Sequence, residues 1–323
     1  MQRFGKALCA LATGLLVSAS LVSWAHAQAW PQRSVRFIVS LGPGSGADIG
    51  ARLIADKLSA KWKQSVVVEN RPGGDAVIAI NAFIGAKDDH VLLYTPTSSF
   101  TAHPFLMAKV PYDPAELGPI ARISNTMVGM IVPPALKIDT VKDFMAQVKA
   151  QPGKMNYSTA TGMTDVIFDG YFKSAGLTIT RVPYRDVVSP LTDLGEGRIQ
   201  AYVGALAIVQ PHIQSGRVKL IAITNSQRAP TQPKIPTIAE AGFPQLTFDG
   251  LIGVFGQRTM AAAVRDRIAA DIKEAVSDKT ISARLTATGQ VVSPGNAADF
   301  RKSMEAQSAK LAAVVKQLGV KPK

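Results

Sequence analysis

Short apolar runs rich in β-branched residues alternate with amphipathic stretches along most of the chain. The apolar runs predict strands at residues 35–41, 66–69, 91–95, 127–132, 155–158, 178–182, 201–203, 220–224 and 251–254. The stretches with helical periodicity predict helices at residues 47–61, 76–85, 141–150, 164–174, 188–196, 208–215, 261–277, 279–288 and 297–317. This alternation is typical of an α/β architecture with parallel sheets.

Residues 1–27 have the pattern of a secretory signal peptide. A short basic start precedes an uncharged apolar segment at residues 8–22, and a small-x-small cleavage site ends at Ala27. We therefore expect cleavage near Ala27 and a periplasmic protein. The alternative is an N-terminal membrane anchor, for which the apolar segment is short. The only cysteine, Cys9, lies in this segment, so the expected mature chain has neither disulfides nor thiolate chemistry.

The chain carries a net charge of +13, and its basic residues are scattered rather than gathered in runs. This distribution fits a small anionic ligand, and we expect no nucleic-acid partner. His90, His103 and His212 lie far apart in the sequence without the spacing of a metal motif, so we expect no metal and interpret them as surface or packing residues. Ser45 lacks the nucleophile-elbow pattern. We therefore expect no catalytic residue and no cofactor.

The stretch SLGPGSGAD, residues 40–48, joins a predicted strand to a predicted helix. Its glycines allow the backbone to approach a ligand closely, and Ser45 with Asp48 forms a capping-box pattern. Read literally, the loop also fits the dinucleotide fingerprint from Gly42 onward. The predicted export and the N–H missing at Pro43 argue against NAD. A loop that opens a helix binds a carboxylate as well as a pyrophosphate, and a tight turn without a ligand is the other alternative.

Three further loops follow predicted strands, at residues 70–76, 95–99 and 158–165. Ligands of open α/β sheets bind at the carboxyl ends of the strands, where small hydroxyl and glycine residues suit carboxylate recognition. Ordinary helix capping is the alternative for each loop. Arg71 and Arg185 are candidates to pair with a ligand carboxylate, or equally with an acid of the protein.

Seven longer stretches, in chain order, read VRFIVSLGPGSGADIGARLIADKLS, VVVENRPGG, VPYDPAELGPIARI, PGKMNYSTATG, ITRVPYRDVVSPLTDLGEGRIQAYVG, PHIQSGRVKLIAITNSQRAP and IPTIAEAGFPQL. Together they resemble the Bug family, the extracytoplasmic solute receptors of tripartite tricarboxylate transporters. The resemblance runs from about Trp30 to the C-terminus. Each motif alone is weak, and their order makes the set specific.

The resemblance implies an α/β protein with the two-lobed periplasmic-binding-protein fold, type II-like, with mixed sheets flanked by helices. Lobe 1 is expected at residues 28–129 plus 249–323 and lobe 2 at residues 130–248, with two crossing segments as the hinge and the ligand cleft between the lobes. Motif by motif, the resemblance implies ligand contacts from Gly42, Pro43, Gly44, Ser45, Gly46, Asp48, Gly74, Asp75, Ala76, Thr97, Ser98, Thr159, Thr161, Gly162, Thr164, Tyr184, Arg185 and Asp186.

The chain departs from the family pattern in the second lobe. Met163 and Asp186 stand where the family has glycine, and their larger side chains predict a reshaped pocket or weaker closure. Ile167 replaces a usual histidine, and Gln200 replaces a usual acid. The identity of the ligand is therefore not carried over. Aliphatic dicarboxylates, amino acids and aromatic carboxylates all stay open.

From these features we expect a periplasmic solute-binding protein that captures a small carboxylate for a tripartite tricarboxylate-type transporter. Its expected partners are the membrane subunits of that transporter, and it is expected to be a monomer. Two alternatives stay open at this stage. One is an exported α/β enzyme acting on a carboxylate, and the other is a ligand-sensing receptor without a transport role.

Overall fold

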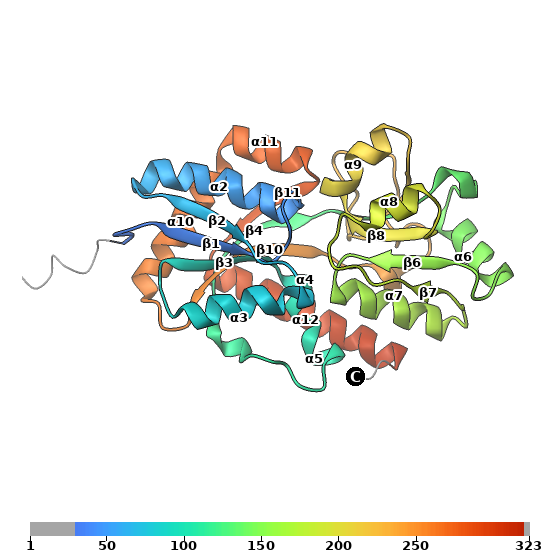
Figure 1. The fold of residues 1–323 in the computed structure, drawn as a ribbon, viewed down its shortest axis with the longest axis horizontal. Helices are drawn as coiled ribbons and strands as arrows, with labels where there is room; N and C mark the ends of the chain where they lie inside the picture. Colours follow the sequence, from blue (N-terminus) through green and yellow to red (C-terminus); the bar gives the residue numbers. More distant parts are fainter. Residues whose placement is uncertain (1–29, 320–323) are drawn as a thin grey trace, which may run out of the picture.

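Two mixed β-sheets, each flanked by helices, lie side by side in the molecule (Figure 1). The computed structural model describes residues 30–319, so the predicted signal peptide at residues 1–27 lies outside the described residues. The first sheet has the strand order β11-β4-β10-β3-β1-β2. Its strands are β1 (Val35–Val39), β2 (Val66–Asn70), β3 (Val91–Pro96), β4 (Leu117–Thr126), β10 (Gly250–Gln257) and β11 (Gln290–Gly295).

The second sheet has the strand order β7-β6-β8-β5-β9. In both sheets some neighbours pair parallel and others antiparallel: β1 is parallel to β2 and β3, whereas β10 is antiparallel to β3 and β4. The expected mixed sheets are confirmed, and the simpler expectation of parallel sheets is wrong for part of each. The strands are β5 (Val128–Val132), β6 (Asn156–Thr159), β7 (Thr180–Arg181), β8 (Ala201–Ala205) and β9 (Lys219–Ile223).

The helices cover both faces of each sheet, as the alternation of the sequence predicts (Figure 1). Among residues 30–319 no helix is both long and apolar enough to cross a membrane. Around the first sheet lie α2 (Gly46–Trp62), α3 (Val77–Ala86), α4 (Thr97–Phe100), α5 (His103–Leu106), α10 (Ala262–Ser277), α11 (Lys279–Ala287) and α12 (Ala297–Leu318). Around the second lie α6 (Val141–Ala150), α7 (Gly162–Ser174), α8 (Pro190–Gly195) and α9 (Leu206–Gln214).

The polypeptide crosses between the sheets at two places that lie against each other. Strand β4 ends at Thr126 and β5 begins at Val128, so the first crossing is a single residue long. On the return path, the Asn225 side chain joins both crossings. Its Oδ1 accepts from the Val128 amide at 2.8 Å, and its Nδ2 donates to the Thr126 carbonyl at 3.0 Å and, more weakly, to Asp249 at 3.3 Å. Asn225 is fully buried, so these hydrogen bonds are shielded from water while they hold the two crossings together.

Helix α12 packs against the cores of both sheets. Phe300 is fully buried against Phe255 under the first sheet, whereas Leu311 is fully buried in the apolar cluster of the second. Between them, the Gln307 amide donates to the Asp249 carbonyl at 2.8 Å and its Oε1 accepts from the Thr97 hydroxyl at 2.6 Å. The C-terminal helix therefore fastens both sheets to the return crossing.

Two strands were not predicted from the sequence. The segment of β4 contains Gly118, Pro119 and Arg122, which interrupt its apolar pattern, yet it lies in the interior of the sheet between β10 and β11. Burial by neighbouring strands overrides local propensity there. Strand β11 is an edge strand that contains Pro294, where a missing N–H is tolerated.

We expect Asn225→Ala to lower the free energy of unfolding by about 2–3 kcal/mol, because the buried amide of Val128 and carbonyl of Thr126 lose their partner. Ser226→Ala, next to it but exposed, is the control and should change stability by less than about 1 kcal/mol. Urea denaturation measures both variants. Equal stability of the two variants would contradict the role given to Asn225.

Candidate ligand-binding site

A cleft opens between the sheets where the carboxyl ends of β1, β3, β6 and β8 face one another. Its deep part, the inner pocket, has a volume of about 50 Å³ and is lined by apolar residues together with Ser45, Gly46, Ser98, Thr126, Thr161 and Thr164. Its wide part, the outer cleft, has a volume of about 790 Å³ and is lined by Gly42, Gly74, Asp75, Asp165, Arg181 and Arg185 among others. The outer cleft has the size typical of small-molecule sites.

Helices from both sides of the cleft begin at the inner pocket, among them α2 and α7. Gly46 and Ala47 in the first turn of α2 line it, and so do Thr161 and Thr164 at the start of α7. The first turn of a helix has backbone N–H groups without intrahelical partners, and the helix dipole adds partial positive charge there. The inner pocket is therefore suited to an anionic group.

The loop that leads into α2 is fixed by Asp48, which is 4% exposed. Its carboxylate accepts from the Gly44 amide at 3.0 Å, from Arg52 at 3.0 Å and from Asn70 at 2.9 Å. Burial raises the pKa of Asp48, but these hydrogen bonds outweigh it and hold the pKa below its ordinary value. The charged Asp48 thus has a structural task, which is to shape the glycine loop.

Thr126 lines the inner pocket, and its side-chain hydroxyl has no partner among the described residues. The Oγ1 of Thr126, at the end of β4, is buried and makes no hydrogen bond to any described residue. Buried polar groups are normally paired, so an orphan hydroxyl at a pocket is a position for a ligand or an ordered water. The backbone carbonyl of the same residue is already held by Asn225.

On the side of the second sheet, Arg181 is shared between two acids. Its Nη1 lies 3.0 Å from Asp165 and its Nε lies 2.9 Å from Asp169, while the Thr159 hydroxyl also bonds to Asp165. Burial nevertheless dominates and raises the pKa of Asp165 to about 6, with Arg181 and Thr159 acting against it. These acids do not form a metal centre, because no group of three or more metal-binding side chains is placed to hold an ion within residues 30–319.

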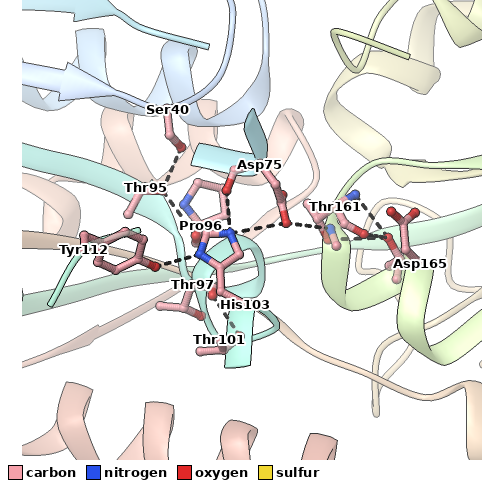
Figure 2. A network of polar contacts seen from close by, with 12 residues as sticks. Ser40, Asp75, Thr95, Pro96, Thr97, Thr101, His103, Tyr112, Thr161 and Asp165 are labelled. Carbon is pink, nitrogen blue, oxygen red and sulfur yellow. Dashed lines mark hydrogen bonds and ion pairs between the residues drawn. The ribbon is translucent and has the colours of Figure 1, made fainter. Parts of the chain in front are cut away.

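Asp75 reaches from the first lobe to the second, and Figure 2 shows it between His103 and the start of α7. Its Oδ2 accepts from the Gly162 amide at 3.2 Å and lies 3.6 Å from the Nε2 of His103. His103 is fully buried, and its Nε2 lies 2.9 Å from the Asp75 carbonyl, which can only accept. Nε2 therefore carries a proton, and Nδ1 lies within hydrogen-bond distance of the Tyr112 hydroxyl, at 2.7 Å.

The structure brings most of the predicted site residues onto the cleft. They are Gly42, Ser45, Gly46, Gly74, Asp75, Ala76, Ser98, Thr159, Thr161, Gly162, Thr164, Tyr184, Arg185 and Asp186. Their contact with a ligand stays a prediction. Pro43, Gly44, Asp48 and Thr97 are not among the residues that line it. Gly44 and Asp48 bond to each other, and Thr97 bonds to Gln307 of α12.

The departures from the family pattern fall in different places. Met163 is 1% exposed, packs in the core of the second sheet and is not among the residues that line the cleft, so its effect on the pocket or on closure stays a prediction. Ile167 is buried in the same core. Asp186 does line the outer cleft, but its carboxylate accepts from the amides of Val188 and Ser189 within its own turn. The Gln200 side chain accepts from the Asn156 amide, outside the cleft lining.

Several residues of the cleft were not predicted from the sequence. Asp165 ends a loop that the sequence did single out, at residues 158–165, but it was not chosen as a site residue. Thr126 belongs to β4, which was not predicted. Only the structure shows that its buried hydroxyl has no hydrogen-bond partner. Leu106 and Met107 enter the outer cleft from α5 without any motif that could have indicated it.

Comparisons with known proteins agree with this geometry. The family model described as tripartite tricarboxylate transporter family receptor matches residues 50–320. A UPF0065 protein of Bordetella bronchiseptica is 28% identical over 300 residues, 92% of this chain and 89% of its own length. BugT of Bordetella pertussis is 28% identical over 313 residues, 95% of this chain and 96% of its own. The structure of R. palustris Rpa4515 with adipate is 26% identical, with a TM-score of 0.85, and covers 91% of this chain and all of that one.

The pKa of Asp165 predicts a dependence of stability on pH. With its pKa raised to about 6, the folded protein holds a proton between about pH 4 and 6 that the unfolded chain has released. The free energy of unfolding therefore falls as the pH rises through this window. Asp165→Asn removes the cost of a buried charge at this position. The variant should therefore be more stable than the wild type at pH 7, by about 1–3 kcal/mol. The difference in stability between the variant and the wild type should shrink toward pH 4, because Asp165 of the wild type is then protonated and uncharged.

Denaturation of the wild type, Asp165→Asn and the exposed control Asp56→Asn at several pH values measures this effect. If the stabilities of the wild type and of Asp165→Asn depend on pH in the same way, the raised pKa of Asp165 is contradicted.

Proposed function

The chain belongs to the tripartite tricarboxylate transporter receptor family, and we propose that it captures a small carboxylate between its two lobes for a transporter of that class. The family is one of periplasmic solute-binding receptors. The R. palustris relative, described with adipate, supports a carboxylate as the class of ligand. The excess of basic residues in the chain supports it further, because net positive charge steers anions toward the protein.

The inner pocket is the observation that carries this proposal. It offers an anion the first turn of α2, the hydroxyl-bearing residues Thr161 and Thr164, and Thr126 with its unpaired hydroxyl, and no acidic side chain lines it. Its volume of about 50 Å³ admits a few waters or one carboxylate group. The remainder of the ligand would extend into the outer cleft, which is much wider.

Ligand capture would proceed by closure of the lobes around the carboxylate. We assign lobe 1 to residues 28–126 plus 249–323 and lobe 2 to residues 128–248. The expected boundary after residue 129 moves because Val128 and Gly129 pair with strands of the second sheet. We place the hinge at the two crossings that Asn225 joins. Membrane subunits of the transporter would then recognise the closed form. The receptor would work as a monomer, exported with cleavage near Ala27.

Thr126→Val tests the inner pocket, because it keeps the shape of the side chain and removes only the hydroxyl. We expect the dissociation constant for a bound carboxylate to rise about ten- to a hundred-fold, the range for one lost hydrogen bond to a charged group. Stability without ligand should not fall, since the hydroxyl is unpaired. Isothermal titration with aliphatic and aromatic carboxylates and amino acids measures the affinity.

Thr247→Val is the matched control. Thr247 also has a buried, unpaired hydroxyl, but it does not line the cleft, so its removal should leave affinity unchanged. Binding that is unaffected by Thr126→Val, or weakened equally by both substitutions, would contradict the inner pocket as the carboxylate site. Failure of the wild type to bind any acid of the panel would contradict the function itself.

A further inference from the structure

We propose that Asp75 makes this receptor select a carboxylate whose far end is neutral or cationic, and reject the dicarboxylate of the same length. The inference rests on the proposed function, in which the inner pocket holds the first carboxylate of the ligand. It concerns the outer cleft, where the other end of the ligand would lie. Asp75 is a specificity-determining residue in this account.

The position for a second anion is already occupied by the protein. Gly162 is the first residue of α7, a helix of 13 residues, and its amide donates to the Asp75 carboxylate at 3.2 Å. Both residues line the outer cleft and neither lines the inner pocket. The positive end of α7 therefore meets a carboxylate of lobe 1, where the distal carboxylate of a ligand would otherwise find its donor.

The backbone holds Asp75 in this place at a cost. Asp75 and Ala76 have φ values of 48° and 74°, a left-handed conformation that non-glycine residues rarely adopt. Such strain persists only where the surroundings enforce it, and here the buried His103 binds the Asp75 carbonyl at 2.9 Å. Gly162 leaves the room for the carboxylate, since a Cβ on it would lie 2.2 Å from the Oδ2 of Asp75.

The charges around this position add to the effect. Asp165 and Asp169 share the single guanidinium of Arg181, so three carboxylates, with Asp75, stand near one cation. Arg185 and Asp186 also line the outer cleft and contribute one charge of each sign. A second ligand carboxylate would enter a region that is already acidic, whereas an ammonium or an uncharged group would not be repelled.

Length-matched ligands test this selection directly. Isothermal titration compares adipate with hexanoate and 6-aminohexanoate, and succinate with butyrate and 4-aminobutyrate. We expect the wild type to bind a monocarboxylate or amino acid of one series at least ten-fold more tightly than the dicarboxylate of that series. Asp75→Gly, which removes both the carboxylate and the strain, should reduce this ratio at least ten-fold by strengthening dicarboxylate binding.

Asp75→Asn is the second variant, because it keeps the side chain and removes only its charge, and it should shift the ratio in the same direction. Asp56→Asn is the control, since Asp56 is exposed on α2 and does not line the cleft. Its ratio should equal that of the wild type. A wild type that prefers the dicarboxylate, or Asp75 variants that keep the wild-type ratio, would overturn the inference alone. Absence of binding to every acid would overturn the proposed function as well.

Discussion

The double crossing between the sheets is the constraint on which the site depends. Thr126 and Val128 lie on either side of one crossing, and Asn225 on the other binds the backbone of both. Because the crossings are adjacent, the carboxyl ends of strands from both sheets face the same space, and α2 and α7 begin on opposite sides of one pocket. Helix α12 spans the two cores and binds the Asp249 carbonyl through Gln307, so the crossing is also held from outside.

Electrostatics divide the cleft into two unlike parts. The inner pocket offers N–H and hydroxyl donors without an acidic side chain, whereas the outer cleft contains Asp75 and Asp165 beside Arg181. A ligand that has an anionic group at just one of its ends satisfies both parts of the cleft. The adipate with which the R. palustris relative is described has an anion at each end, so a shared fold is compatible with a different choice at the second end.

The sequence was sufficient for the α/β class, for the two-lobed fold through the family resemblance, and for most of the loops that reach the cleft, but not for β4 and β11. The Gly-rich loop before α2 and the Thr-rich loop before α7 are local signals, and both line the inner pocket. Contacts between distant segments could not be read in this way. Asp75 follows a glycine in a predicted loop, but nothing local indicates that its carboxylate bonds to Gly162. Likewise, Met163 looked like a cleft residue because its neighbours are, and helical rotation points it into the core.

A crystal structure with a bound monocarboxylate tests the central claim most directly. The account predicts a carboxylate oxygen in the inner pocket, at about 2.7 Å from the Thr126 Oγ1, the usual length of such a hydrogen bond. It also predicts that Asp75 stays on the Gly162 amide, with the uncharged end of the ligand in the outer cleft. A ligand carboxylate bound at Gly162 in place of Asp75, with the inner pocket left to water, would contradict the account.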